Sequence, residues 1–594
     1  MTNINDIQVN PRELLALYLN QEYDQLSESL IRLLEHFENV AYFQLNSEGQ
    51  YFVNAFVKNF LYLFTQPDYL LSDNHAIQFI RFNATISNLV AMSSFKTTDR
   101  YLEILRSQPH NFLKVLALYS ARNTVYLDRK KLFDTHREYT SIWYSHFYEL
   151  YFSGFVNERV NEHFKEHLYY GAAEKRLTNF YNVSNVYFAV TYADGDRDRE
   201  IKQKINRSVQ EGAIGKTIQI KNTPHPKKIA IVTGLWFPAH SVYRTLFHFV
   251  ESLKDDYELT LINLNLIRND IDFQHFKEVI NVDVKDIFSN QINSIQKNEF
   301  MVSYYPDVGM TDASIFLANL RIAPIQVCTV GHSVSTFGSE IDYFISGADV
   351  EVSDNAQANY SERLVLLPGL GIINNPPLYQ PQHLQKDRPE FIINCPWTCY
   401  KANYQLIQTL DKIVKASPKK ILLRFFTGGS ESRKNSFLPF AKDLELILNK
   451  DCFEVVPAQP YEQYMALLEL GDICIDSYHF GGCNTVADVL YLGKPIVTFE
   501  GNKWYNRIGS QMLRMVGLSE LIATNEGEYL HLILKLIEND EYRFGIQEKI
   551  RQADLSNTIF NSESKKYFKK AIDFLVKNDR KIKDKDWKKP ILIR

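Results

Sequence analysis

The sequence predicts an α/β protein in which an all-helical N-terminal domain precedes two lobes, each built on a doubly wound parallel sheet. Three observations predict this class. Apolar residues recur at helical spacing through roughly the first 200 residues. From residue 227, short β-branched runs alternate with helical segments. These runs form two series, separated by the proline-rich stretch NNPPLYQPQ at 374–382.

The N-terminal region reads as a bundle of helices. Leucine and tyrosine side chains recur every three or four positions between Leu14 and Leu34, and aromatic-rich segments follow at 51–64 and 139–152. No 34-residue period is present, which argues against a tetratricopeptide array. We interpret these aromatic side chains as the core of the bundle; the alternative is a groove that receives a polypeptide.

The two strand series predict parallel sheets with right-handed crossovers, because a helical segment separates each run from the next. The first series consists of 227–236, 257–264, 299–306, 323–331, 342–347 and 363–369. The second consists of 391–396, 419–426, 452–457, 472–477 and 494–501. Ligands of such sheets bind at the carboxyl ends of the strands, so we expect the site there.

A chain of 594 residues is too long for a single hydrophobic core. We expect four parts: a helical domain at 1–222, a first lobe at 223–382, a second lobe at 383–560, and a C-terminal helix with a basic tail at 561–594.

Composition narrows the class of protein. The 66 basic and 70 acidic residues give a net charge of −4, which does not suggest a nucleic-acid surface. The six cysteines form no CxxC pair and no zinc-like spacing, as expected for reduced thiols in a cytosolic protein. The first residues lack a signal-peptide pattern, and no stretch approaches the roughly 20 apolar residues of a membrane span. We expect a cytoplasmic protein without an integral membrane segment.

The most informative motif is DSYHFGGCNTVADVLYLGKPIVTFEG at 476–501. A predicted strand ends at Asp476, a glycine-containing loop follows, and a helix begins near Asn484 and Thr485. Free backbone N–H groups and the positive end of the helix dipole suit a diphosphate there. Asp488 lies one turn after Asn484 on the same helix face, where its carboxylate can accept from ribose hydroxyls.

This motif resembles the C-terminal lobe of the O-GlcNAc transferase family, glycosyltransferase family 41, and of its bacterial branch that glycosylates asparagine in adhesins. Further blocks carry the same resemblance, in order: LWFPAHSVYRTL at 235–246, YPDVGMTDASIFLANLRIAPIQVCTVGH at 305–332, NYSERLVLLPG at 359–369 and RIGSQMLRMVGLSELIA at 507–523. Together they cover most of 226–525. The resemblance implies a GT-B-type pair of Rossmann-like lobes, and the helical N-terminus without repeats is similar to the adhesin-modifying branch.

The resemblance also implies roles for individual residues. Lys401 matches the lysine that contacts the donor diphosphate, where an ammonium stabilises a leaving group that becomes more negative. Thr398 stands one turn before it. Asn484, Thr485 and Asp488 match the phosphate and ribose contacts. In the first lobe, His240, Ser241 and Arg244 match a group of residues that faces the cleft. Gly331 and His332 match the position that contacts the sugar or the acceptor. Of all these, His240, His332 and Lys401 are the expected catalytic residues.

Three departures from the family pattern leave the preferred sugar open. Cys483 replaces a polar residue, commonly histidine. Ala458 stands where the adhesin-modifying branch has histidine, and TGGSES at 427–432 lacks a matching glutamine.

DGDRD at 194–198 resembles the start of an EF-hand loop and a metal-binding DxD. Arg199 and Ile205 replace the glycine and glutamate that a calcium loop needs, so we interpret this segment as a solvated turn. No metal and no cofactor are expected.

The resemblance implies an inverting transfer of a hexose from a UDP-sugar to asparagine in N-x-S/T sequons of an adhesin-like protein. Two alternatives stay open: O-linked transfer to Ser/Thr or to an existing glycan, and a catalytically silent binding protein that uses its helical domain as a scaffold.

Overall fold

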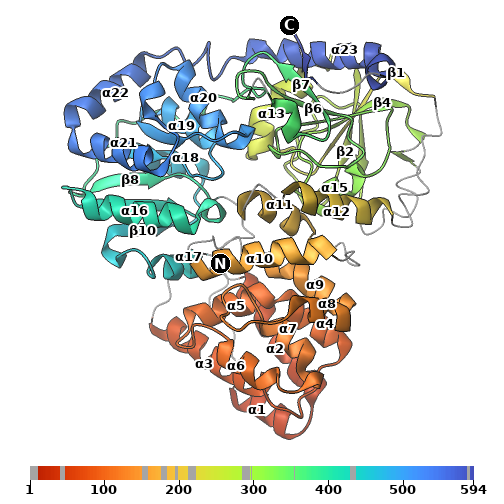
Figure 1. Cartoon of the computed structure of the whole chain (residues 1–594), viewed down its shortest axis with the longest axis vertical. Helices are drawn as coiled ribbons and strands as arrows, with labels where there is room; N and C mark the ends of the chain where they lie inside the picture. The colour runs from red at the N-terminus through yellow and green to blue at the C-terminus, as the bar shows by residue number, and fades with distance from the viewer. Residues whose placement is uncertain are drawn as a thin grey trace. The chain divides into compact units, whose positions relative to one another are not determined.

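The computed structural model describes residues 11–39, 47–149, 158–174, 183–193, 198–211, 223–283, 294–295, 297–352, 355–428, 437–584 and 589–594 (Figure 1). The chain divides into two compact units. Unit 1 comprises residues 1–193 and 387–467, and unit 2 comprises 194–386 and 468–594. The four-part division at 222, 382 and 560 stays a prediction.

Among its described residues, the N-terminal part of unit 1 contains helices and connecting loops but no strand, as predicted. The aromatic segment at 51–64 forms most of one helix, in which Phe56, Phe60 and Phe64 lie one turn apart and are buried. Their rings pack along that helix at centroid distances of 5.8 and 4.9 Å. The described helices of this part are α1 Pro11–Leu19, α2 Tyr23–Asn39, α3 Ser47–Phe64, α4 Asp73–Arg81, α5 Asn83–Met92, α6 Asp99–Leu105, α7 Phe112–Leu118, α8 Arg129–Thr135, α9 Arg137–Phe147, α10 Glu158–Glu174 and α11 Val183–Ala193.

Unit 1 also contains three parallel strands. They are β8 Phe391–Cys395, β9 Ile421–Phe426 and β10 Phe453–Val456, and their order is β10-β9-β8. Helices α16 Tyr404–Ala416 and α17 Phe437–Leu444 connect them. A buried ion pair of 3.0 Å between Arg122 and Asp443 joins the helical part to α17.

Unit 2 holds an eight-stranded sheet in the order β14-β7-β6-β5-β4-β1-β2-β3, and all neighbouring strands in it run parallel. Buried β-branched and aromatic side chains fill its central strands, as the first strand series predicts. The strands are β1 His225–Thr233, β2 Glu258–Asn263, β3 Glu278–Asn281, β4 Phe300–Tyr305, β5 Ile325–Thr329, β6 Tyr343–Gly347, β7 Arg363–Leu367 and β14 Ile591–Leu592.

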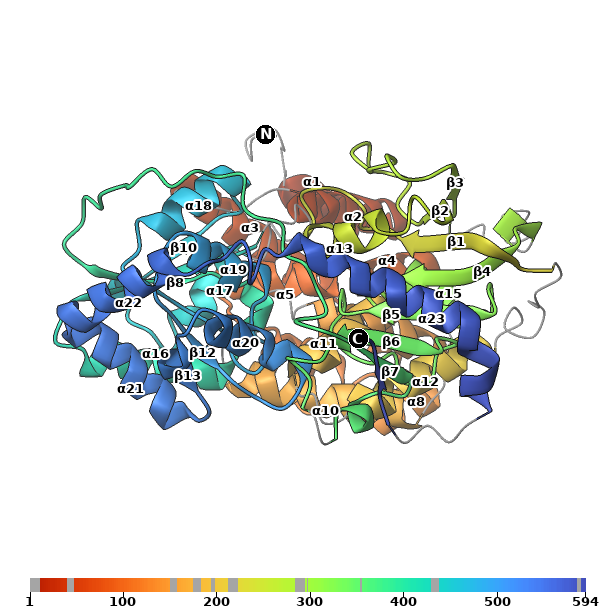
Figure 2. The same cartoon turned by 90° about the horizontal axis from the view of Figure 1, so that it is seen from above.

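Helix α23, Lys565–Lys583, lies on one face of this sheet beside α13, Ser241–Glu251 (Figure 2). The rings of Phe249 and Phe568 stack between the two helices at 4.5 Å and 2°. After α23, Ile591 pairs with Val365 at the sheet edge, so the end of the tail is a strand and not a free segment.

The remaining strands of unit 2 are also parallel. They are β11 Ile473–Ile475, β12 Ile496–Phe499 and β13 Ile522–Ala523. The other helices are α12 Asp198–Gln210, α15 Asp312–Ala318, α19 Asn484–Tyr491, α20 Ile508–Met515, α21 Glu526–Glu538 and α22 Asp540–Gln552. Helix α18, Tyr461–Glu469, spans the boundary between the two units.

Helix α12 belongs to unit 2, where its polar side chains form hydrogen bonds. Asn206 donates to the carbonyl of Thr336 at 2.6 Å, and Asn319, which caps the end of α15, donates to Asn206 at 2.9 Å. The polar face of α12 therefore bonds to the loop that follows β5.

Candidate functional site

The start of α19 is built by an aspartate and two glycines. Asp476 follows β11, and its Oδ1 accepts from the backbone N–H of Ser477 at 2.8 Å and of Gly482 at 2.7 Å. A Cβ atom on Gly482 would lie 2.2 Å from Thr485 Oγ1, so a larger residue there would force the Thr485 side chain to move. This loop connects the carboxyl end of β11 to the N-terminus of α19, and the free N–H groups of a helix N-terminus suit a phosphate.

Asn484 joins the first turns of α19 and α13. Its Nδ2 donates to the carbonyl of Ser241 at 3.3 Å. Its Oδ1 is buried and has no hydrogen-bond partner among the described residues. Because that oxygen can only accept, it suits a ligand hydroxyl such as that of ribose rather than a phosphate oxygen.

Asp488 and Arg244 form a two-pronged ion pair between the same two helices. The distances are 2.8 Å from Arg244 Nη2 to Asp488 Oδ1 and 3.4 Å from Nη1 to Oδ2. The Asp488 side chain is 2% exposed and that of Arg244 is 18% exposed. The carboxylate predicted to hold ribose thus already has a protein partner, although a carboxylate has about four acceptor positions.

His240 caps the N-terminus of α13. Its Nδ1 accepts from the backbone N–H of Val242 at 3.2 Å, which assigns the proton of the neutral ring to Nε2. The ring packs edge-on against Phe237. In this tautomer His240 offers a hydrogen-bond donor at Nε2.

His332 lies in the interior of unit 2. It is 4% exposed, and its Nε2 lies 3.0 Å from the ammonium of Lys202 on α12. Burial, and then the Lys202 charge, hold the pKa of His332 well below its usual range. Burial also lowers the pKa of Lys202 to about 7. The neutral imidazole accepts a hydrogen bond from Lys202, a residue that was not among the predicted site residues.

Gly331 has a packing reason to be glycine. A Cβ atom at this position would lie 2.0 Å from the carbonyl oxygen of Pro306.

Asp307, which follows Pro306 in the chain, is fully buried, and burial raises the pKa of its carboxyl to about 7. Thr233 donates to Asp307 Oδ2 at 2.9 Å, whereas Oδ1 is buried without a partner among the described residues. Sequence reasoning also missed Asp307, although it directly follows a predicted strand.

Thr398 and Lys401 belong to unit 1 and follow β8. The carbonyl of Thr398 accepts from Lys401 N at 2.9 Å in a short 3-10 turn, Cys399–Lys401. The Thr398 hydroxyl is buried and has no hydrogen-bond partner among the described residues. Gly428, with φ of +86°, follows β9, and a Cβ atom there would lie 2.4 Å from Thr398 Cγ2. Both predicted residues therefore lie at the carboxyl ends of parallel strands.

The structure brings His240, Ser241, Arg244, Asn484, Thr485 and Asp488 together at the facing ends of α13 and α19 in unit 2. Gly331 and His332 lie in unit 2, in the loop after β5.

The described residues contain no group of three or more His, Cys, Asp or Glu side chains that could hold a metal ion. DGD at 194–196 lies outside the described residues, as does the 429–432 part of TGGSES. All six cysteines have free thiols. None of the helices within the described ranges is both long and apolar enough to span a membrane.

Comparisons with known proteins extend these observations. Residues 380–570 match the model of Glycosyl transferase family 41. A UDP-glucose:protein N-beta-glucosyltransferase of Actinobacillus pleuropneumoniae serotype 5b is 23% identical over 556 residues, which cover 86% of this chain and 87% of that protein. A probable UDP-N-acetylglucosamine–peptide N-acetylglucosaminyltransferase SPINDLY of Hordeum vulgare is 25% identical over 260 residues, which cover 41% of this chain and 26% of that protein.

Among solved structures, a mutant O-GlcNAc transferase of Thermobaculum terrenum aligns with a TM-score of 0.59 and 18% identity, covering 86% of this chain and 98% of that chain. This likeness shows a shared fold, with a helical N-terminal region followed by two parallel-sheet lobes. Together the matches confirm the resemblance predicted from the motifs: this chain is a GT-B glycosyltransferase similar to family 41.

Proposed function

We propose that this chain is an inverting, metal-independent enzyme that transfers a hexose from a UDP-sugar to asparagine in N-x-S/T sequons of an adhesin-like protein in the cytoplasm. The relative that aligns over most of both chains is named a UDP-glucose:protein N-beta-glucosyltransferase, which supports this donor and this linkage. The free thiols of all six cysteines are compatible with a reducing compartment.

The observation that carries the proposal is the geometry at the start of α19. Asn484 Oδ1 is buried without a protein partner among the described residues, beside helix N–H groups that suit a phosphate. A nucleoside diphosphate supplies both kinds of group, a ribose hydroxyl and phosphate oxygens.

The proposed reaction forms one bond and breaks another. The asparagine nitrogen attacks the anomeric carbon on the face opposite the leaving group, and the bond from that carbon to the UDP oxygen breaks. The electron pair leaves with the diphosphate, and the nitrogen gives up one proton, which the departing diphosphate or solvent water accepts. The N-terminus of α19 stabilises the charge that grows on the diphosphate. The resemblance to family 41 assigns the same role to the Lys401 ammonium.

His240 is assigned a hydrogen-bonding role in this scheme. Its Nδ1 is occupied by the Val242 N–H, so Nε2 carries the proton of the neutral ring. This ring can donate a hydrogen bond to the donor sugar or diphosphate. To act as a base at Nε2, it would first have to change tautomer and give up the cap of α13.

The test is the intact mass of a synthetic peptide with one N-x-T sequon, incubated with the enzyme and a panel of UDP-hexoses. A single hexose on asparagine is expected with UDP-glucose, and it should still form in excess EDTA. Sugar found only on Ser or Thr would replace the asparagine acceptor with a hydroxyl acceptor. Loss of activity in EDTA that manganese restores would overturn metal independence.

A UDP-N-acetylglucosamine donor is the second candidate, because a plant relative is named for that donor. The same panel decides between them. A protein that binds UDP but releases none from any UDP-sugar in the presence of peptide would be the silent scaffold.

A further inference from the structure

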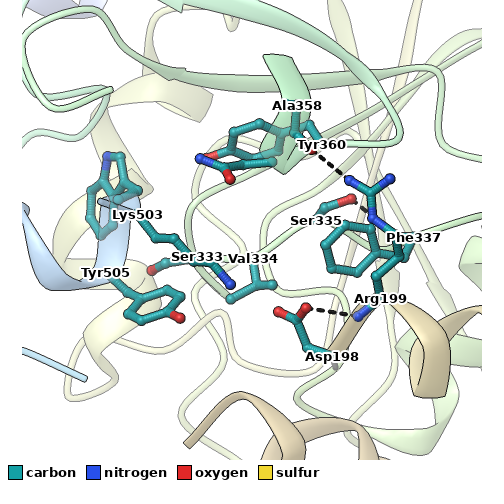
Figure 3. A pocket seen from close by; sticks show the side chains of 12 residues that line it. Asp198, Arg199, Ser333, Val334, Ser335, Phe337, Ala358, Tyr360, Lys503 and Tyr505 are labelled. Carbon is teal, nitrogen blue, oxygen red and sulfur yellow. Dashed lines mark hydrogen bonds between the residues drawn. The ribbon is translucent and has the colours of Figure 1, made fainter. Parts of the chain in front are cut away.

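Unit 2 contains a pocket of about 190 Å³ that none of the predicted donor contacts lines (Figure 3). Its walls come from the start of α12, from residues 333–337 after β5, from residues 358–360 after β6 and from residues 503–505 after β12. Three of these four segments follow the carboxyl ends of parallel strands, the edge at which ligands of such sheets bind.

Asp198 supplies an unused acceptor to this pocket. Its side chain is 2% exposed, and its Oδ1 accepts from the backbone N–H of Arg199 at 2.7 Å. Its Oδ2 is buried and has no hydrogen-bond partner within the described part of the chain. In Figure 3 the carboxylate points into the pocket. Because an unmade hydrogen bond of a buried charged oxygen is costly, this atom calls for an N–H or O–H from a ligand.

Cationic groups surround the same space. The Lys503 side chain extends into the pocket toward the side on which Asp198 lies (Figure 3). The Arg199 guanidinium lies 5.1 Å from the centre of the Phe337 ring and donates to the carbonyl of Ala358. A carboxylate ligand would meet Asp198, and a cationic ligand would meet Lys503 and Arg199. The pocket therefore favours a neutral group that both donates and accepts hydrogen bonds.

The aromatic walls favour a side chain over a sugar ring. The Phe337 ring is covered by Arg199, the Tyr360 ring packs on Phe344 at 4.6 Å, and the Tyr505 ring stacks on Phe480 at 4.5 Å. At least one face of each ring is thus occupied by the protein. The volume of about 190 Å³ is also below the range of about 300–1,000 Å³ typical of sites for larger ligands.

We propose that this pocket binds the side-chain carboxamide of the acceptor asparagine. Its N–H donates to Asp198 Oδ2, and its C=O accepts from Lys503. A carboxamide carries a donor and an acceptor on adjacent atoms without net charge, which matches the two sides of the pocket. This inference rests on the proposed function, since it names the subsite at which that function receives its acceptor.

The test measures whether the side chain at position 198 determines the preference for an asparagine over an aspartate peptide. Two synthetic peptides differ only at the sequon position, asparagine in one and aspartate in the other, and their binding to the full-length protein is measured by calorimetry in the presence of UDP. The wild type should bind the asparagine peptide about ten- to a hundredfold more tightly, since aspartate loses the donor and adds a like charge. Asp198→Asn removes that charge, so its preference for asparagine should fall to about threefold or less.

Two further variants complete the design. Lys503→Met should weaken binding of the asparagine peptide about tenfold. Glu200→Gln is the matched control, because Glu200 lies on the same helix, is exposed and pairs with Lys204 at 3.6 Å. It should change neither affinity nor preference. Circular dichroism and the affinity for UDP alone confirm that each variant is folded.

The outcomes separate this proposal from the proposed function. If hexose is transferred to asparagine but Asp198→Asn keeps the wild-type preference, the pocket assignment is wrong and the function stands. If no UDP-sugar supports transfer but the coupling between residue 198 and the peptide persists, the function fails and the pocket stands. Displacement of the asparagine peptide by a free hexose, abolished by Asp198→Asn, would instead assign the pocket to a sugar and overturn the carboxamide.

Discussion

Asp488 in unit 2 and Thr398 in unit 1 received similar roles from sequence, as contacts for the donor, but the structure surrounds them differently. Asp488 is held by Arg244 at 2.8 Å, whereas the buried Thr398 hydroxyl has no partner among the described residues. A residue of the first kind supports the fold and binds ligand. A residue of the second kind gains its hydrogen bond only with ligand. Substitution should therefore lower both stability and donor binding at Asp488, but donor binding alone at Thr398.

The largest expected effect is at Lys401, which follows β8 beside Thr398 and should meet charge that grows only as the donor bond breaks. Lys401→Ala should lower kcat by about 10²–10³, or about 2.7–4 kcal/mol by comparison with the loss of oxyanion-hole donors. The change in KM for the donor should be small, and circular dichroism should show a folded protein. Near-wild-type turnover by the folded variant would show that the diphosphate does not bind at the end of β8.

Asp488→Ala should lower the stability of the folded protein. Removing one partner of a buried ion pair costs about 3–5 kcal/mol, and the lower end applies because Arg244 is 18% exposed. The variant should have a lower Tm and also a higher KM for the donor. The double variant Arg244→Met, Asp488→Ala provides the control: if it is no more stable than Asp488→Ala alone, the pair is not what holds α13 to α19.

The interior pair of Lys202 and His332 should show itself in the pH dependence of stability. Burial lowers the pKa of Lys202 to about 7 in the folded protein, below its ordinary value of 10.5. Between these values the unfolded chain binds more protons, so the free energy of unfolding gains a contribution that rises with pH, by at most about 1.4 kcal/mol per unit. Lys202→Met should lack this contribution.

Denaturation at pH 7 and pH 9 measures it as the difference between wild type and variant. Lys204→Met on the same helix is the control and should keep the wild-type slope. Parallel pH profiles of wild type and Lys202→Met would contradict the assignment.

Thr398→Val should give the smallest effect, and it should change donor binding without lowering stability. The substitution removes a hydroxyl that has no protein partner, so the Tm should stay the same or rise slightly. The KM for the donor should rise about three- to tenfold, the value of one neutral hydrogen bond of about 0.5–1.5 kcal/mol. Thr409→Val is the matched control, because that buried hydroxyl already donates to the carbonyl of Gln405 at 3.0 Å. A similar KM for wild type and Thr398→Val would show that the ligand does not reach this hydroxyl.

Local patterns were enough to predict much of the fold. The β-branched runs predicted the buried central strands, and the loop at 476–483 predicted the start of α19. Both patterns lie within a few consecutive residues, so they can be recognised in the sequence alone. Strand β3 was not predicted, since its side chains are mostly exposed and lack an apolar run.

The site was harder to predict where it depends on distant partners. Arg244 and Asp488 are 244 positions apart, so no spacing rule could pair them. Lys202 lies on a helix rich in charged residues and reads as a surface lysine, but the loop after β5 covers it and leaves His332 as its partner. Asp307 follows a recognised strand, yet only the packing around it shows that its carboxyl is buried.

Strand β14 has a consequence for the order in which the chain is made. It pairs with β7 at the edge of the eight-stranded sheet, but it leaves the ribosome roughly 220 residues after β7 does. At about 5–20 residues per second, that interval lasts on the order of 10–45 s. During this time β7 presents an open edge, the kind of surface to which a strand of another nascent chain can add. The short pairing of Ile591 and Leu592 thus acts late, as a closing step that ends this period of exposure.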